Sequence, residues 1–237
     1  MKKYYYDLHI HSCLSPCGDD ESTPNSIAGM GELNGLQIMA LTDHNTTRNC
    51  PYFFEAASNH GIIPIAGMEL TTSEEIHIIC LFETLSNAMA FDSEIEKRRI
   101  LIENRTDIFG NQLVCDSMDN VVSKEKHLLS NATAVSFDEV PELVEKFGGV
   151  CYPAHIDRDS NSVTAVLGGL PPNHPFKFCE LHNKERENDF KNTGCEFIVS
   201  SDAHYLWDIS ESENFFALPD DDKNAVKNLF EILRGCE

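Results

Sequence analysis

The chain has 237 residues, of which 41% are hydrophobic and 24% are charged, so it is long enough and apolar enough to bury a full globular core. Its 39 acidic and 18 basic side chains give a formal net charge of −21, which argues against tight binding to nucleic acid or to an anionic membrane. The sequence contains no apolar run near the roughly 20 residues that span a bilayer, and its polar start offers no signal core. We therefore expect a cytoplasmic protein.

The first predicted strand covers residues 5–10 and carries the motif Asp7-Leu8-His9-Ile10-His11. Alternation along a strand places His9 and His11 on one face, roughly 6–7 Å apart, where they could bind one metal ion or flank two. Leu8 and Ile10 would then lie together on the opposite face. A single pair of this kind is as often structural, so the interpretation depends on the rest of the chain.

Helices and strands alternate through the first third of the sequence. Thr23-Pro24 starts a helix that ends at Asn34-Gly35, and a second helix is predicted over residues 50–61. Apolar runs predict strands over residues 36–42, 62–66 and 75–82. This order predicts a parallel α/β architecture, in which functional side chains gather at the carboxyl ends of the strands.

The pattern changes over residues 85–134. A helix with a charged face is predicted over residues 86–104, and the stretch after it is polar and poorly periodic. This region holds too few apolar residues for a core of its own. We therefore expect one domain over residues 1–237, with an insertion or lid at 85–134.

The alternation resumes after the insertion. Further helices are predicted over residues 137–147, 160–167, 184–192 and 221–233. The strands among them are predicted over residues 150–155, 176–181 and 196–200, and polar side chains again stand at their ends.

The nine cysteines are scattered, odd in number and without a Cys-x-x-Cys motif, which favours reduced thiols in a cytoplasmic protein. Cys13, Cys17 and Cys50 lie beside the polar strand ends. They are either loop cysteines without a role, or soft-metal ligands or redox-sensitive groups.

Histidines and carboxylates recur at the ends of strand-like apolar segments, where core packing gives no reason for them. They are His9, His11, His44, Glu69, His77, His155, Asp202 and His204, with Asp19 and Asp20 in the first loop. Mixed imidazole and carboxylate donors suit Zn²⁺, Mn²⁺ or Fe²⁺ and not Ca²⁺. So many donors exceed the coordination of one ion, and the pattern predicts two or three divalent ions with at least one bridging carboxylate.

Six short motifs, spread in order over nearly the whole chain, resemble those of the PHP superfamily, the polymerase and histidinol phosphatase group. They are DLHIHS (7–12), LTDHN (41–45), GMEL (67–70), EIHIICLF (75–82), CYPAHID (151–157) and VSSDAHY (199–205). The resemblance implies an α/β fold in the form of a distorted seven-stranded (β/α) barrel, like a TIM barrel, with a metal cluster at the carboxyl ends of its strands. It also implies hydrolysis of phosphate esters.

The resemblance further implies how three ions would share the ligands. The first would be held by His9, His11, Glu69 and Asp202, the second by His77, His155 and a bridging Glu69, and the third by Asp19, His44 and His204. Asp19 is matched by counting back from Pro24. Asp20 remains the alternative, because this loop is longer than in short members of the family.

These motifs predict a hydrolase that cuts a small phosphorylated substrate with a hydroxide activated on a di- or trinuclear metal cluster. The candidate catalytic residues are His155, His204 and Asp202, with a histidine moving the proton. The candidate substrate-binding residues are Arg158 and His182. Arg158 is the best-placed cation to hold phosphate, although Arg48 and Lys184 also lie in strand-end loops, and His182 either lines the pocket or is a surface histidine.

Two further residues near the predicted site have no assigned ligand role. Asp43 either orients a neighbouring imidazole or caps its strand, and Glu180 would line the pocket.

Two other classes of function remain open. The superfamily also contains exonucleases and nucleotide-processing modules, but the charge of −21 disfavours a polyanionic substrate. A non-catalytic metal-binding scaffold would lack some ligands, whereas every expected position in this sequence is filled.

Overall fold

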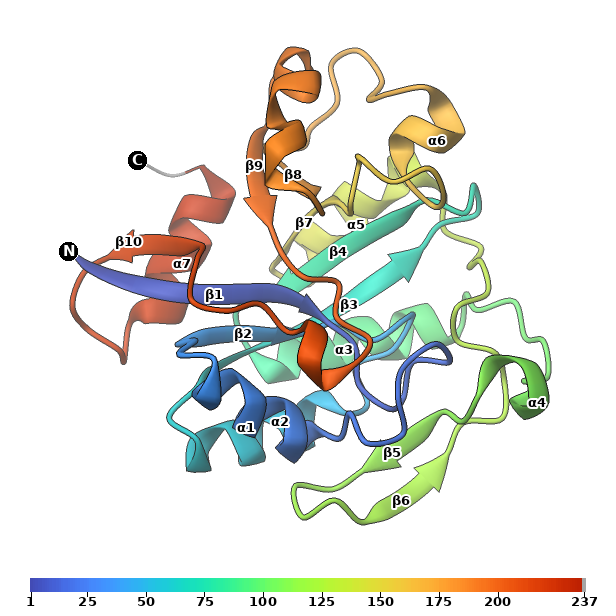
Figure 1. The fold of residues 1–237 in the computed structure, drawn as a ribbon. Coiled ribbons are helices and arrows are strands. Elements are labelled where there is room, and N and C mark those ends of the chain that lie inside the picture. The colour runs from blue at the N-terminus through green and yellow to red at the C-terminus, as the bar shows by residue number, and fades with distance from the viewer. Residues whose placement is uncertain (236–237) are drawn as a thin grey trace.

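The computed structural model describes residues 1–235 and shows a curled, mixed β-sheet with helices around it (Figure 1). Within these residues six strands pair in the order β10-β1-β2-β3-β4-β7. They are β1 (Lys2–Ile10), β2 (Ile38–Leu41), β3 (Ile63–Thr71), β4 (His77–Phe82), β7 (Gly149–Pro153) and β10 (Phe215–Leu218). A parallel pair, β8 (Phe178–Leu181) and β9 (Glu196–Val199), lies beside β7.

The sheet curls back toward its first strand through β8 and β9. The Ile156 N–H donates to the Glu180 carbonyl at 2.9 Å, which connects the end of β7 to β8. Ile10 at the end of β1 pairs with Ala203, just beyond β9. Seven strands therefore follow one another around the predicted distorted barrel, which is confirmed, and β10 is an additional antiparallel strand on the edge of β1.

Apolar side chains fill both sides of this sheet. The inner cluster takes Tyr4, Ile38, Ile79 and Tyr152 from the strands, and α7 (Ala225–Arg234) closes it at one end. The outer cluster packs the strands against α1 (Pro24–Leu33), α2 (Cys50–Asn59), α3 (Leu85–Glu96) and α5 (Val140–Lys146). With one end of the barrel sealed by apolar packing, the polar strand ends meet at the other end.

Shorter elements connect these helices and strands. They are α4 (Thr106–Phe109), α6 (Val163–Leu167) and 3₁₀ helices over Phe137–Glu139, Lys184–Thr193 and Leu206–Asp208. Among the helices of residues 1–235, none combines the length and the apolar character needed to cross a membrane.

Strand β4 runs opposite to the predicted direction. It pairs antiparallel with both β3 and β7, in a sheet whose β1, β2 and β3 are parallel. Only residues 72–76 separate β3 from β4, too few for the crossover that a parallel pair requires. The reversal brings His77, the first residue of β4, level with Thr71 at the end of β3, and so places it at the polar end of the barrel.

The prediction that Leu8 and Ile10 lie on the same face of the first strand is wrong. Leu8 packs in the inner cluster, whereas Ile10 packs in the outer one, so the two do not share a face. The pairing of β1 with β2 shifts register between Asp7 and Ile10, and such a shift turns the side chains that follow it.

The predicted insertion contains more regular structure than its composition indicated. Helix α3 ends at Glu96, well before residue 104, and β5 (Leu113–Cys115) pairs with β6 (Val121–Lys124) in an unpredicted hairpin. The Leu113 N–H donates to the Cys13 carbonyl at 2.7 Å. The hairpin therefore packs on the loop that follows β1.

A buried ion-pair network holds the same region together. Glu125 lies 2.6 Å from Arg48 and 3.4 Å from Arg99, and accepts a hydrogen bond from the His127 N–H at 2.8 Å. Burial raises the pKa of Glu125, but this hydrogen bond and the two guanidinium charges outweigh burial and lower the pKa to about 2. The carboxylate is therefore charged across the neutral range.

Replacing Glu125 by Gln should lower the free energy of unfolding by about 2 kcal/mol at neutral pH, because it leaves two guanidinium groups without their charged partner. A carboxyl with a depressed pKa contributes stability above its unfolded value of 4.5 and loses it as the pH falls through about 2. Urea titrations at several pH values measure the free energy of unfolding of both proteins. The difference between variant and wild type should shrink as the pH falls from 4.5 to about 2. The exposed Glu103→Gln variant is the control. A stability difference between Glu125→Gln and wild type that did not change with pH would contradict the role of the Glu125 charge.

Candidate metal centre

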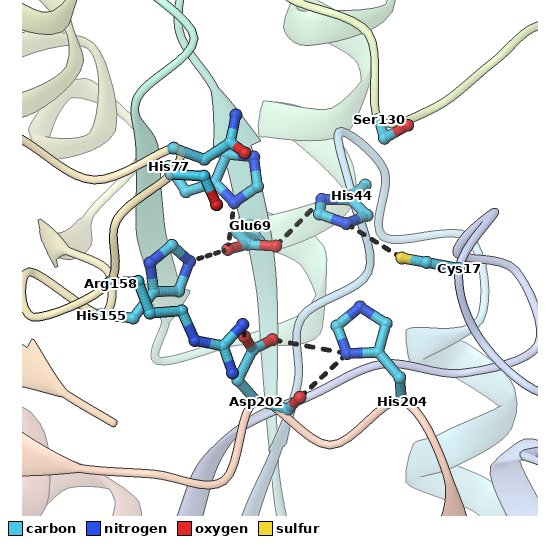
Figure 2. Close-up of a pocket in the computed structure, with 11 residues that line it drawn as sticks. Cys17, His44, Glu69, His77, Ser130, His155, Arg158, Asp202 and His204 are labelled. Carbon is cyan, nitrogen blue, oxygen red and sulfur yellow. Dashed lines mark hydrogen bonds and ion pairs between the residues drawn. The ribbon is translucent and has the colours of Figure 1, made fainter. Parts of the chain in front are cut away.

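A cavity of about 310 Å³ opens at the polar end of the barrel. Its wall includes six of the nine predicted ligands, namely His44, Glu69, His77, His155, Asp202 and His204, which come from separate strand ends and loops (Figure 2). Two of them sit at strained backbone positions, since His155 has a φ of 28° and Asp202 a φ of 53°. Positive φ values are costly for residues other than glycine and are often kept at functional sites.

Glu69 lies at the middle of this assembly and is 1% exposed. Its Oε1 is 2.7 Å from His77, 3.1 Å from His155 and 3.4 Å from His9. Its Oε2 is 2.9 Å from His44 and 3.2 Å from His11. One carboxylate therefore faces five imidazoles, as a bridging ligand would.

Three groups of side chains bring their donor atoms close enough together to hold an ion. The inner group is His9, His11, Glu69 and Asp202; the rim group is His44, Glu69 and His77; and the outer group is His11, His44 and His204. The inner and rim groups share Glu69, so they can hold two ions with one bridging carboxylate.

The donor atoms of the inner group are about as far apart as the ligand atoms of one metal ion. His9 Nε2 lies 3.1 Å from His11 Nε2, and each lies 3.2 Å from Asp202 Oδ1. Ligand atoms about 2.0–2.1 Å from a tetrahedral ion are about 3.3 Å apart. The donors therefore stand at separations that fit an ion between them.

Several of these donors are buried without a hydrogen-bond partner among the described residues: His44 Nδ1, Glu69 Oε2, His155 Nδ1 and Asp202 Oδ1. His44 Nδ1 is only 2.9 Å from Glu69 Oε2, yet the two atoms are not oriented to form a hydrogen bond. Unpaired buried polar groups cost about 1–3 kcal/mol each. A site for more than one ion would satisfy them together.

Hydrogen bonds on the far side of His9 and His11 set the tautomers of these two imidazoles. Both oxygens of Glu180 accept from His9 Nδ1, at 2.9 and 3.0 Å. Ser15 Oγ donates to Asp43 at 2.8 Å and so accepts from His11 Nδ1, also at 2.8 Å. In both histidines the Nε2 lone pair is left facing the inner group.

Replacing Glu180 by Gln should lower metal affinity about 10–100-fold with little change in fold, because the amide holds the His9 tautomer less firmly than the carboxylate does. Competition with a chromophoric chelator measures that affinity. The exposed Glu185→Gln variant should bind metal like wild type, and equal affinity in all three proteins would contradict the orienting role of Glu180.

The charges of the site change the protonation of its histidines. Burial lowers the pKa of His11, but the carboxylates of Asp202 and Glu69, each with an oxygen 3.2 Å from Nε2, raise it to about 9. At His204 the balance is the opposite. Burial lowers the pKa, and the neighbouring charge of His11 lowers it further, to about 3. His204 is therefore neutral at physiological pH, with a lone pair free for an ion.

Two predicted ligands lie outside the three groups: His155, whose Nε2 is 3.1 Å from Glu69 Oε1, and Asp19. Asp19 Oδ1 accepts from the Glu21 N–H at 2.8 Å, and Asp20 accepts from the Asn111 side chain at 2.7 Å. Cys17, two residues earlier, is the member of this loop that lines the cavity, with its Sγ 3.5 Å from His44 Nε2.

The two predicted substrate-binding residues are in contact with each other. Arg158 lines the cavity, 2.7 Å from Asp202 Oδ2 and 3.2 Å from His182 Nδ1, while His182 itself is exposed. The wall also includes Ser130, Ser160 and Asn161. Nothing in the sequence pattern marked these three, because they lie in loops without a motif.

Comparison with known proteins agrees with this geometry. The family model described as the PHP domain matches residues 7–161. An uncharacterized protein of Methanocaldococcus jannaschii is 30% identical over 100 residues, which are 38% of this chain and 58% of that protein. A 5'-3' exoribonuclease of Haemophilus influenzae is 30% identical over 127 residues, 52% of this chain and 44% of the enzyme. The chain thus spans about half the length of these curated relatives.

Solved structures share the fold at low sequence identity. A lesion-specific endonuclease from Pyrococcus furiosus superposes with a TM-score of 0.67 at 16% identity, over 100% of this chain and 57% of that one. A protein from Bifidobacterium adolescentis, assigned as a metal-dependent phosphoesterase, superposes with a TM-score of 0.55 at 17% identity, over 99% of this chain and 97% of that one. Since the family model covers well over half of the sequence, the chain belongs to the PHP domain family.

Proposed function

We propose that the protein is a metal-dependent phosphoesterase that hydrolyses a small phosphorylated substrate with two or three divalent transition-metal ions, Zn²⁺, Mn²⁺ or Fe²⁺. The observation that carries the proposal is Glu69, a buried carboxylate that faces five imidazoles at a cavity. The inner group would hold one ion, and Glu69 with His77 and His155 would hold a second. Divalent ions in such a site lower the pKa of bound water and stabilise charge on phosphoryl oxygens.

The protein's own side chains would bind the substrate and move protons. The Arg158 guanidinium at the cavity wall can donate two parallel hydrogen bonds to a phosphoryl oxygen pair. His204 lines the cavity at the outer group, beside Asp202, and is one candidate to carry the proton. His155 contacts Glu69 and can serve as the second proton carrier.

The size and charge of the site support a small substrate. A volume of about 310 Å³ is at the lower end of the range for small-molecule pockets. The net charge of −21 repels polyanions, which supports a single phosphate group over a long nucleic acid. The eight cysteines in the described part of the chain are free thiols, which supports a reducing, cytoplasmic setting.

A direct test combines metal analysis with a substrate screen. Protein prepared anaerobically with metal supplied should contain at least two ions per chain and release phosphate from one of the nucleotide, sugar or amino-alcohol phosphates. The His9→Ala and Asp202→Ala variants should lose that activity. Equal phosphate release by wild type and variants would contradict the proposal.

Replacing Arg158 by Ala should raise the KM of the substrate and the Ki of inorganic phosphate about tenfold or more, because one charge-assisted hydrogen-bonded pair is lost. Arg158→Lys, which keeps the charge without the planar geometry, should fall between wild type and Ala. Arg105→Ala, at an exposed site in the insertion, is the control. An unchanged Ki for phosphate would exclude Arg158 from binding.

A second candidate is the processing of short nucleic-acid ends. It is favoured by the similarity to the 5'-3' exoribonuclease, which extends over half of this chain. Cleavage of short RNA or DNA oligonucleotides in preference to the phosphomonoesters of the screen would support it.

A further inference from the structure

The wall of the cavity beside the metal centre is polar throughout. Apart from the proposed ligands and Cys17, its lining residues are Arg158, Ser130, Ser160 and Asn161. Within the described part of the chain, no aliphatic side chain and no phenyl, phenol or indole ring belongs to this wall. The part of a substrate that lies beyond its phosphate group would therefore contact hydroxyl and amide groups.

These polar residues lie on more than one side of the cavity. Ser160 and Asn161 follow Arg158 in the loop between β7 and α6, whereas Ser130 comes from the insertion. Figure 2 shows Ser130 on the side of His44, across the centre from Arg158. A substrate bound through its phosphate group at Arg158 would extend across the cavity toward the insertion.

Hydrogen bonds fix the loop of the insertion that carries Ser130. The side-chain amide of Asn45 donates to the Leu129 carbonyl at 2.7 Å and to the Asn131 carbonyl at 2.8 Å, on either side of Ser130. Asn45 is 1% exposed, and its Oδ1 accepts from the Thr71 N–H at 2.8 Å. Ser130 is therefore held at the cavity by a buried side chain that also binds the end of β3.

The loop after β7 is fixed in a similar way. Asn161 Nδ2 donates to the Glu75 carbonyl at 3.1 Å, and the Asn161 carbonyl accepts from the His77 N–H at 2.8 Å. The Ser162 hydroxyl donates to the Arg158 carbonyl at 2.7 Å. Both sides of the cavity are thus preformed, so little ordering of the protein would oppose the binding of a ligand that fits them.

The polar wall argues against three other kinds of phosphate ester. A nucleobase binds by stacking on an aromatic ring, and the stacked pair Tyr205 and Trp207 is not part of the cavity wall. An alkyl or aryl group would find no apolar surface to cover. An ammonium group needs a carboxylate, yet Glu69 and Asp202 belong to the metal groups, and Asp202 also lies 2.7 Å from Arg158.

We propose that the substrate is the phosphate monoester of a small polyhydroxylated compound, such as a sugar or a polyol, and that Ser130, Ser160 and Asn161 bind its hydroxyl groups. This inference rests on the proposed phosphoesterase function. A serine hydroxyl donates and accepts, and an asparagine side chain offers both N–H groups and a carbonyl, so each can pair with an alcohol. Hydrolysis would consume one water, break the phosphoester bond and release inorganic phosphate and the free alcohol.

Matched substrate pairs test this inference with the metal-loaded enzyme. Glycerol phosphate and propyl phosphate differ only in hydroxyl groups, and the kcat/KM of wild type should be about tenfold or more higher for glycerol phosphate. Ribose phosphate lacks the base of AMP, and wild type should prefer ribose phosphate. Ser130→Ala should reduce the preference for glycerol phosphate about threefold or more. Ser123→Ala, at an exposed site in the same insertion, is the control and should retain that preference.

Calorimetry with phosphonates measures binding separately from hydrolysis. In dihydroxybutylphosphonate and butylphosphonate a carbon atom replaces the ester oxygen of glycerol phosphate and propyl phosphate, so neither compound is cleaved. Metal-loaded wild type should bind the dihydroxy compound about tenfold more tightly. Ser130→Ala should narrow that difference in affinity.

The outcomes separate this inference from the proposed function. If wild type cleaves propyl phosphate as efficiently as glycerol phosphate, or prefers AMP to ribose phosphate, the inference is overturned while the phosphoesterase proposal stands. If Ser130→Ala and Ser160→Ala both keep the full preference for glycerol phosphate, the assigned hydroxyl contacts are overturned. If metal-loaded protein releases phosphate from none of these esters or those of the screen, both proposals are overturned.

Discussion

Glu69→Gln should reduce phosphoesterase activity by about 10³-fold or more and remove more than one metal ion per chain. Glu69 belongs to both the inner and the rim group and contacts the histidines of each. The amide has no negative charge and offers one oxygen in place of two, so it cannot bridge two cations. Elemental analysis and steady-state kinetics on the same preparation measure both losses.

Glu55→Gln, on the exposed face of α2, is the matched control and should leave both quantities unchanged. Circular dichroism distinguishes loss of ions from loss of fold. A Glu69→Gln protein with full metal content and wild-type turnover would show that Glu69 has no bridging role.

Removal of the metal ions should abolish activity and lower the free energy of unfolding by about 3 kcal/mol or more, since ligands present at about 100 times their dissociation constant contribute about 2.7 kcal/mol each. Without ions, the buried oxygens of Glu69 and Asp202 lack the partners that would satisfy them. Chelation should proceed more readily at acidic pH, because protons compete for His11 and His44, whose pKa values are raised to about 9.

Urea denaturation before and after dialysis against a chelator measures the change in stability. Added Zn²⁺ or Mn²⁺ should restore both the midpoint and the activity, which excludes irreversible damage. Unchanged stability and turnover in a sample shown to contain no metal would contradict a functional metal centre.

The sequence alone predicted most of the candidate metal centre, because its proposed ligands obey local rules. His9 and His11 are two residues apart in one strand, and His155 and Asp202 directly follow apolar runs. A strand places its end residues at the rim whatever its neighbours are, so these positions could be predicted without knowing the packing. The motif order also determined the barrel class.

Other features required the tertiary structure, because they depend on residues far apart in the chain. Glu180 was expected at the pocket wall, but it lies behind His9 and fixes its tautomer across 171 positions of sequence. The β5–β6 hairpin forms in a stretch of low periodicity, where its contact with the first loop stabilises it. The antiparallel direction of β4 could have been predicted from the sequence, since the five residues between β3 and β4 are too few for the crossover of a parallel pair.

The sequence by itself determined which strand ends carry imidazoles and carboxylates, and thereby the family and the candidate metal centre. Only the tertiary structure decided which side chain of the first loop faces His44. Counting residues along a loop favoured Asp19, whereas turns at Ser15 and Gly18 direct Cys17 to the cavity. Strand periodicity is fixed by local backbone geometry, but the conformation of a loop is fixed by the hydrogen bonds it makes with the rest of the fold.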